Sequence, residues 1–251
     1  MRVLMSVTSW ETVRLQNDLT SFGFPVTVAE DGIEIFECLD LLGHPVVVME
    51  TNLPDLRWQV ALDQLRRECP SMSILVVDTN GSERDRLEAL EIGADDVISP
   101  QIDAAELTAR ILAVASRRAG YSGPTLYIGP LKVKLQERRV WWGTEQVKLS
   151  PAMYSIFEKL CLSAPTVVSK HALMGELYGI DEGGEERVID VFVANLRARL
   201  AAVGAPRDLI ETIRGRGYRL AELPRLAESA EPAFDWPVED FGVPVEISSV
   251  A

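Results

Sequence analysis

The first 118 residues repeat one pattern five times, and this pattern limits the folds open to the chain. Each time, a short apolar run is followed by a longer segment whose apolar residues recur at helical spacing. The apolar runs are residues 3–5, 26–28, 46–49, 74–77 and 97–98, and the helical segments are 10–22, 33–42, 57–68, 82–92 and 103–118. Strands without polar positions are typical of a parallel sheet covered by helices on both faces. We therefore expect a doubly wound, five-stranded, flavodoxin-like α/β domain, with any site at the carboxyl ends of its strands, near residues 7–9, 50–51 and 78–79.

Residues 126–222 have a different, α+β organisation. Strand-like runs at 126–128, 131–135, 140–142 and 146–149 predict an antiparallel meander that turns at 143–144. Ser150 before Pro151 predicts a helix start, because Ser caps free helical N–H groups and Pro suits the first helical position. Ser169 caps the next helix in the same way. A helix over 187–200, followed by two short strand-like runs that close on Gly215-Arg216-Gly217, completes the pattern of a winged helix.

The helix expected over 187–200 has two distinct faces. Its apolar stripe consists of Ile189, Phe192, Val193, Leu196 and Leu200. The opposite face is slim, with Val191, Ala194, Asn195 and Ala198 at its centre and Arg187, Arg197 and Arg199 at its edges. A slim face fits the major groove of DNA, Asn can pair with adenine through two hydrogen bonds, and Arg reaches phosphates or guanine. The pattern is that of a recognition helix, with an ordinary helix carrying solvated arginines as the alternative; the hairpin and the segments before the helix strengthen the first interpretation.

Three further cations extend this predicted interface with double-stranded DNA. Arg214 and Arg216 lie at the tip of the hairpin, where they would reach the adjacent minor groove or the backbone. Lys170 lies at a helix start, where free N–H groups also attract phosphate. We expect weak non-specific affinity, because the positive charge of this region is small.

The formal net charge of −13 would argue against DNA binding if the charge were spread evenly along the chain, but it is not. Residues 1–120 hold 10 Arg and no Lys against 20 acids, whereas residues 121–223 hold 14 basic against 12 acidic residues. Residues 224–251 hold six acids and one Arg, with Phe234, Trp236 and Phe241 among four prolines. The positive excess therefore lies in the segment with the helix and hairpin. We expect residues 223–251 to form a mostly disordered acidic tail, with docking to a partner or to the basic domain as the alternative.

The sequence gives little support for other classes of protein, such as membrane proteins, metalloproteins and enzymes. No apolar run is long enough to cross a bilayer and the first residues do not resemble a signal peptide, so we expect a cytoplasmic protein. Cys38, Cys69 and Cys161 are widely spaced and predict free thiols, and the two His residues are too isolated for a metal site. No phosphate-cradling glycine motif appears, and no nucleophile, base and orienting group coincide. We expect no cofactor, no metal and no enzymatic activity.

Several motifs are similar to those of a known family. The segments MRVL at the start, ETNLPD at 50–55, GADD at 93–96 and AAELTARI at 104–111 resemble the receiver domain of bacterial two-component response regulators. The segments LSPAMYSIFEKL, SKHALMGELYG and IRGRGYRL resemble the winged-helix effector domain of the OmpR/PhoB family, and ELYGIDEGGEERVIDVF looks closest to alphaproteobacterial cell-cycle and flagellar regulators. The resemblance implies a receiver at 1–118, a linker at 119–125 and a DNA-binding domain at 126–222. It also implies that the loop 164–168 meets RNA polymerase.

The phosphorylation site implied by this resemblance carries unusual residues. The acidic pair that holds Mg²⁺ in the family falls on Thr8 and Ser9, the phosphate acceptor on Glu50, and the lysine on Pro100. The hydroxyl position falls on Asp78 or Thr79, and residues 1–131 contain no lysine at all. Phosphoryl transfer needs a carboxylate nucleophile and cations that neutralise charge. We therefore expect a receiver that is not phosphorylated. We also expect Glu50 to be a polar residue in an inactive site, with permanent imitation of a phosphoaspartate as the alternative.

The dimerisation surface implied by the resemblance is retained. Charged residues match it at Arg86, Glu91, Asp96, Glu106 and Arg110. Opposed pairs, Arg86 with Glu106 and Asp96 with Arg110, would each occur twice across a two-fold axis. The sequence thus predicts a DNA-binding transcription regulator that dimerises through its receiver without phosphorylation, on a direct-repeat or paired site. The alternatives are a conventional phosphorylated regulator and a protein-interaction adaptor with weakened DNA binding.

Overall fold

The computed structural model describes residues 1–42, 44–179 and 186–223. The tail from residue 224 lies outside these residues, so the expectations for it stay predictions. The N-terminal part alternates strands and helices: β1 (Val3–Ser6), α1 (Trp10–Ser21), β2 (Val26–Ala29), α2 (Gly32–Leu42), β3 (Val46–Glu50), α3 (Trp58–Glu68), β4 (Ser73–Val77), α4 (Glu83–Ile92), β5 (Asp96–Ile98) and α5 (Ala104–Arg118). The predicted five-stranded parallel sheet is confirmed, with the strand order β2-β1-β3-β4-β5.

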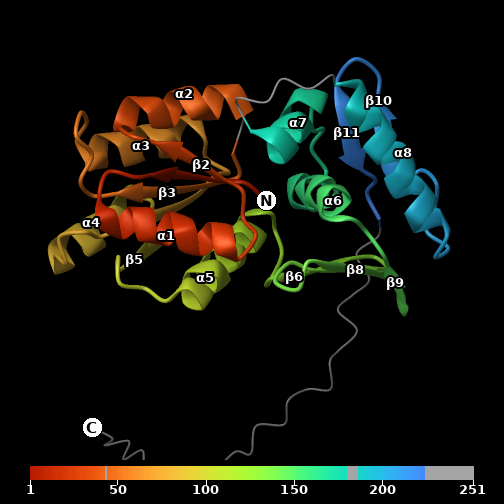
Figure 1. Ribbon diagram of the computed structural model, residues 1–251, viewed down its shortest axis with the longest axis horizontal. Coiled ribbons are helices and arrows are strands. Elements are labelled where there is room, and N and C mark those ends of the chain that lie inside the picture. The colour runs from red at the N-terminus through yellow and green to blue at the C-terminus, as the bar shows by residue number, and fades with distance from the viewer. Residues whose placement is uncertain (43, 180–185, 224–251) are drawn as a thin grey trace, which may run out of the picture.

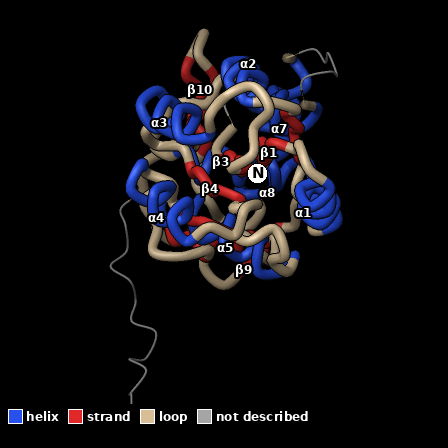
Figure 2. The backbone as a smooth tube through the Cα atoms, turned by 90° about the vertical axis from the view of Figure 1, so that its left-hand side faces the viewer, coloured by secondary structure: helices blue, strands red, loops and turns tan. Residues whose placement is uncertain are grey.

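The strands are mostly apolar because both faces of this sheet are covered. Along β1, Val3 and Met5 belong to one apolar cluster and Leu4 to the other. In β3 and β4 the same alternation divides neighbouring residues between the two faces, as expected for side chains that point up and down in turn. Helices α1 and α5 lie on one face and α2 and α3 on the other (Figure 1). Figure 2 views the receiver end of the molecule, with α4 and α5 along the same side.

The C-terminal part contains a meander, three helices and a hairpin. Its elements are β6 (Thr125–Ile128), β7 (Leu131–Lys134), β8 (Arg139–Trp142), β9 (Glu145–Val147), α6 (Pro151–Ser163), α7 (Lys170–Tyr178), α8 (Arg187–Ala201), β10 (Ile210–Ile213) and β11 (Gly217–Leu220). Ser150 caps α6, with Pro151 at its first position, and Ser169 caps α7. The antiparallel meander and the β10–β11 hairpin match the sequence prediction. This part packs beside the receiver with α8 at the far edge (Figure 1).

Candidate nucleic-acid interface

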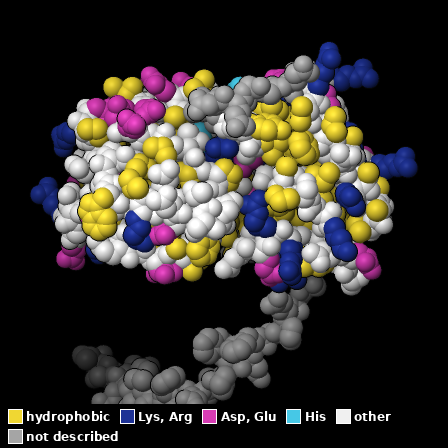
Figure 3. All heavy atoms as spheres, in the orientation of Figure 1, with side chains coloured by type: hydrophobic (Ala, Val, Ile, Leu, Met, Phe, Trp, Pro, Cys, Tyr) yellow, Lys and Arg dark blue, Asp and Glu magenta, His cyan; other side chains and the backbone are white. Residues whose placement is uncertain are grey.

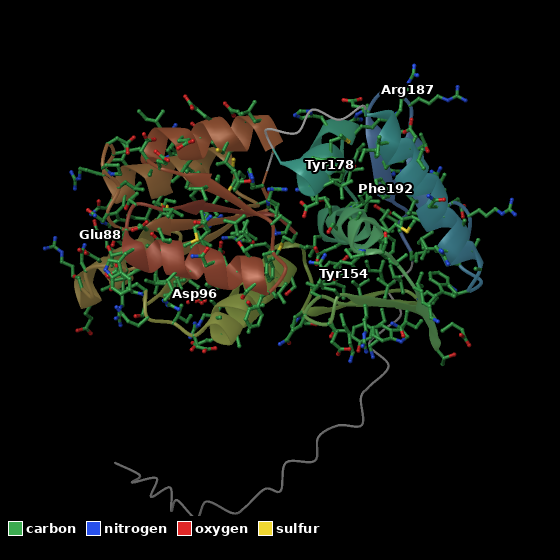
Figure 4. All side chains as sticks on the ribbon, viewed as in Figure 1. Glu88, Asp96, Tyr154, Tyr178, Arg187 and Phe192 are labelled. Atoms are coloured by element: carbon green, nitrogen blue, oxygen red, sulfur yellow. The ribbon has the colours of Figure 1, made fainter. Side chains whose placement is uncertain are left out.

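Helix α8 presents the slim face outward. Ile189, Val193, Leu196 and Leu200 are buried beneath it, and Phe192 packs against the same core. Val191 is 61% exposed at the middle of the outer face, and Asn195 beside it is exposed as well. Figure 4 shows Arg187 pointing away from the molecule at the start of the helix, whereas Phe192 turns toward the core. Within the part of the chain that the structure describes, the outer face is therefore exposed and could meet a groove.

The exposed arginines lie at both ends of this face. Arg187 and Arg199 are exposed on α8, and Arg214 and Arg216 are exposed at the tip of the hairpin. Lys and Arg side chains project beyond the edge of the molecule formed by α8 (Figure 3). Because phosphates lie along both sides of the major groove, this spread of charge suits a helix lying in the groove with the hairpin at its flank.

Arg197 has a different environment from the other predicted contacts. Its guanidinium donates to the carbonyl oxygen of Ile210 at 2.6 and 3.0 Å and to Thr212 Oγ1 at 2.8 Å. It also lies 5.8 Å from the centre of the Tyr218 ring. These contacts join the recognition helix to the hairpin, so we regard Arg197 as a positioning residue. The sequence offered no sign of this, because the partner atoms are a main-chain carbonyl and residues of another element.

Lys170 is also engaged within the protein. Its Nζ donates to Asp190 of α8 at 2.8 Å, and the same carboxylate accepts a hydrogen bond from the Tyr218 hydroxyl at 2.5 Å. The hydrogen bonds from Lys170 and then Tyr218 hold the pKa of Asp190 below its usual range. Burial, together with the bond to Asp190, raises the pKa of Tyr218 to about 12. The network ties α7, α8 and β11 together and pairs the charge of Lys170 with Asp190, so the DNA contact of Lys170 stays a prediction.

Glu50 lies fully buried at the end of β3, with both carboxylate oxygens turned toward the β1–α1 segment. Oε1 accepts from Thr8 N at 2.7 Å and Thr12 Oγ1 at 2.6 Å, and Oε2 lies 3.1 Å from Thr8 Oγ1. The Thr8 hydroxyl also lies 2.8 Å from the carbonyl oxygen of Asn52. Divalent cations of the Mg²⁺ type need carboxylate oxygens that are free to bind them. The residues at this edge do not fit such an ion, because Glu50 is occupied by hydroxyl and amide donors and Asp78 by backbone N–H groups and Arg86.

Asp78 is buried after β4 and holds the segment that leads into α4. Its Oδ1 accepts from the N–H groups of Asn80, Gly81 and Ser82 at 3.2, 2.9 and 3.4 Å. Its Oδ2 pairs with Arg86 Nε at 3.0 Å. Arg86 is thus bonded within its own receiver through Nε, and its pairing with Glu106 of a partner stays a prediction. Thr79 instead interacts with Thr51, their hydroxyl oxygens lying 3.1 Å apart.

The remaining charged positions of the predicted dimer surface lie on α4, β5 and α5. Arg110 pairs with Asp96 at 2.9 Å and with Glu106 at 2.7 Å, and these hydrogen bonds raise the pKa of Arg110. Glu91 is exposed on α4. Two apolar residues that the sequence analysis did not single out share this helix: Leu87 is 60% and Leu90 51% exposed. Leu87 and Leu90 are three residues apart and therefore share one face of α4, away from the buried Ala89. This spacing could have indicated an exposed apolar face from the sequence.

The comparisons with known proteins agree with the two-part architecture. Residues 12–112 match the family described as "Response regulator receiver domain", and residues 143–220 match "Transcriptional regulatory protein, C terminal". The chain is 31% identical over 213 residues to the cell cycle response regulator CtrA of Brucella anthropi, which spans 84% of this chain and 90% of that protein. CtrA of Brucella ovis matches over the same shares of the two chains, again at 31% identity.

Solved structures with the same two-part organisation are more distant. Response regulator DrrB, a Thermotoga maritima OmpR/PhoB homologue, is 19% identical, with a TM-score of 0.42 over 88% of this chain and 98% of that one. A streptococcal redox sensor described as evolved from two-component response regulators is 22% identical, with a TM-score of 0.41 over 88% of this chain. None of the helices among residues 1–42, 44–179 and 186–223 is long and apolar enough to span a membrane. The two family models and the CtrA relatives together place the chain among the response regulators that join a receiver domain to a C-terminal transcriptional regulatory domain.

Proposed function

We propose that this protein regulates transcription by binding specific DNA sequences as a receiver-mediated dimer, without phosphorylation of the receiver. The observation that carries the proposal is the outer face of α8, where exposed Val191 and Asn195 are flanked by Arg187 and Arg199. Arg214 and Arg216 supply the flanking contact. The protein acts in the cytoplasm, where its DNA lies, with no cofactor and no enzymatic activity. The loop 164–168 is the surface it offers to RNA polymerase.

Base recognition is assigned to Asn195 and phosphate binding to Arg199. Asn195→Ala removes a side chain that reads adenine, so it should lower affinity for the preferred site by about tenfold while leaving scrambled DNA unaffected. Arg199→Ala should lower affinity for both kinds of DNA and reduce the salt slope by about 1. The measurement is fluorescence anisotropy at several salt concentrations. The assignment fails when both variants behave identically on the two DNAs.

The closed environment of Glu50 supports independence from phosphorylation. Its carboxylate lies against Thr8 and Thr12, so the observed contacts favour a structural role over imitation of a phosphoaspartate. Incubation with acetyl phosphate and Mg²⁺ should add no phosphoryl group by intact-mass spectrometry, and DNA affinity should not change. Glu50→Asp should also remain unmodified, because Thr8, Ser9 and Pro100 still replace the family's acids and lysine. Incorporation into the wild-type protein would restore the conventional, phosphorylated alternative.

Dimerisation is assigned to α4, β5 and α5, with Leu87 and Leu90 as its apolar contacts. We expect light scattering at tens of micromolar to give a dimer, and Leu87→Glu with Leu90→Glu to give a monomer. Val60→Glu is the matched control, because Val60 is similarly exposed, at 47%, on α3. A monomeric wild-type profile, or equal effects of the two changes, would remove this part of the proposal.

Genome-wide DNA occupancy distinguishes the proposed regulator from the alternative, a protein-interaction adaptor. Wild-type protein should give sharp peaks that share a sequence motif, and the peaks should vanish in an Arg199→Ala, Arg216→Ala double variant. Featureless occupancy by both proteins would favour the adaptor, whose support is the small positive excess of residues 121–223. The same experiment supplies the half-site sequence for binding measurements with paired half-sites.

A further inference from the structure

A buried cluster of charges joins the receiver to the winged helix. The amino group of Met1, just before β1, forms ion pairs with Glu158 of α6 and, at 2.9 Å, with Glu176 of α7. Met1 is 1%, Glu158 2% and Glu176 3% exposed. Buried carboxylates persist only when cations or hydrogen bonds compensate them. Here the receiver supplies part of the positive charge that compensates two carboxylates of the winged-helix part.

Other basic groups surround the same two carboxylates. Lys159, beside Glu158 on α6, is 8% exposed, and Arg2 is close enough to Glu176 to interact electrostatically. The backbone at Gly179 approaches Arg2 so closely that a Cβ there would lie 3.3 Å from Arg2 Nη1. Burial alone would lower the pKa of the Met1 amino group, but Glu158 and Glu176 raise it above its ordinary value. The amino group of Met1 and the two carboxylates therefore compensate one another electrostatically.

Two hydrogen bonds flank the charged cluster. His171 Nε2 of α7 lies 2.9 Å from the carbonyl oxygen of Leu41 in α2. Arg138 donates to the carbonyl oxygen of Gly23 at 3.2 Å and stacks on Tyr154, whose hydroxyl in turn bonds Glu158 at 3.0 Å. Figure 4 places Tyr154 between α6 and the meander. Three separate parts of the receiver, the start of β1, the end of α2 and the turn after α1, thus hold the winged helix.

Interfaces between the domains of one chain are usually smaller and more polar than obligate protein interfaces, and the domains usually move relative to each other. We propose that Glu158 and Glu176 are positioning residues that lock the winged helix onto the receiver, so that both domains meet DNA as one rigid body. Since α8 lies at the edge away from the receiver, the lock leaves the recognition face open (Figure 1). The consequence for DNA rests on the proposed function. If each chain is rigid, a receiver-mediated dimer holds its two recognition helices at one fixed separation. Affinity should then depend sharply on the spacing between half-sites.

The lock itself is tested without DNA, by small-angle X-ray scattering of the full chain. Wild-type protein should fit the docked arrangement, and a Glu158→Gln, Glu176→Gln double variant should show a larger radius of gyration with unchanged helical content. Glu137→Gln is the control, because Glu137 is an exposed acid that pairs with Lys134 within the meander. An expanded wild type, or a double variant that scatters like the wild type, overturns the proposal.

A second variant keeps the test decisive if the double variant does not fold. A Gly-Ser extension in front of Met1 turns its ammonium into an amide while leaving both glutamates in place. We expect the extended protein to open in the same way, with a new cleavage site for a protease between residues 119 and 124. The same extension at the C-terminal end should change nothing. Resistance of the N-terminally extended protein equal to that of wild type also overturns the lock.

The consequence for DNA is tested with paired half-sites whose spacer changes by one base pair at a time. Wild-type affinity should fall at least tenfold when the spacer leaves its optimum by half a helical turn and recover after about 10 base pairs, one full turn. In the double variant this dependence should shrink to less than threefold. Equal dependence in the two proteins contradicts the lock. Absence of any DNA binding contradicts the proposed function instead, because the scattering result stands on its own.

Discussion

At the scale of single residues, Gly217 is fixed by steric contact. Its φ is +136°, and a Cβ there would lie 2.0 Å from the carbonyl oxygen of Val168 and 2.8 Å from Ser169 Cα. The close approach allows Val168 and Tyr218 to exchange two backbone hydrogen bonds, at 2.7 and 2.9 Å. The hairpin is thereby attached to the loop before α7.

Gly217→Ala should therefore destabilise the winged helix strongly. Gly215 is the matched control: it also has positive φ, at +70°, but a Cβ there meets nothing within 4 Å. Gly215→Ala should cost about 1–2 kcal/mol for the left-handed backbone alone. Gly217→Ala should cost at least twice as much, measured by urea unfolding. Equal costs would mean that the contact with Val168 relaxes freely.

Arg197 and Arg199 are neighbours on α8 with different expected roles. Arg197→Ala removes charged hydrogen bonds to Ile210 and Thr212, so the free energy of unfolding should fall by about 1–3 kcal/mol. Arg199→Ala should leave thermal stability unchanged, because Arg199 is exposed. Calorimetry of the two variants separates the roles. If Arg197→Ala is as stable as the wild type but binds DNA more weakly, Arg197 contacts DNA directly, as the sequence predicted.

At the scale of elements, α4 is held at its start by Asp78. The side chain is fully buried and binds three successive N–H groups as well as Arg86. This contact fixes the helix that carries Leu87 and Leu90. The position of the proposed dimer surface thus depends on the contacts of Asp78 at the end of β4.

Asp78→Ala should cost about 2 kcal/mol and increase hydrogen exchange over residues 80–92, because several bonds to a buried charge are lost together. Arg86→Ala should cost less than about 1 kcal/mol, since the Arg86 side chain is 53% exposed and its ion pair is screened by water. Hydrogen exchange with mass spectrometry measures both variants. Similar protection of α4 in wild type and Asp78→Ala would show that the helix is held by packing alone.

At the scale of the whole molecule, His44 lies at the domain contact with 4% exposure. Its Nε2 lies 2.9 Å from Thr27 Oγ1. Burial, then Lys159 and Arg2, lower the pKa of His44 to about 4, while Glu176 opposes them. The residue is therefore neutral in the folded protein at neutral pH.

The lowered pKa predicts acid sensitivity. Unfolded protein binds a proton at His44 near its ordinary pKa of 6.5, whereas folded protein resists protonation until about pH 4. Stability is thus complete above about pH 6.5 and should fall by roughly 3 kcal/mol as pH drops toward 4. His44→Gln should lose part of this dependence in urea unfolding, whereas His171→Gln, with an exposed ring, should keep it. Identical pH profiles for all three proteins would exclude His44 as the cause.

Much of the fold was predictable because it depends on local patterns. Five apolar runs alternating with helical spacing require a parallel sheet covered on both faces, and Ser150-Pro151 and Ser169 mark helix starts that the structure confirms. The outer face of α8 was also readable, because helical periodicity alone divides Val191 and Asn195 from the buried stripe.

Only the tertiary structure decided which charged groups remain available. The sequence placed Arg197 and Lys170 among DNA contacts and Arg86 on a dimer surface, but β10, Asp190 and Asp78 engage them. It placed Glu50 at the end of β3 without indicating the direction of its carboxylate. It gave no sign that Met1 meets Glu158 and Glu176, residues more than 150 positions away. Periodicity fixes which face of an element is buried, whereas ion pairs and hydrogen bonds depend on distances between elements that only packing sets.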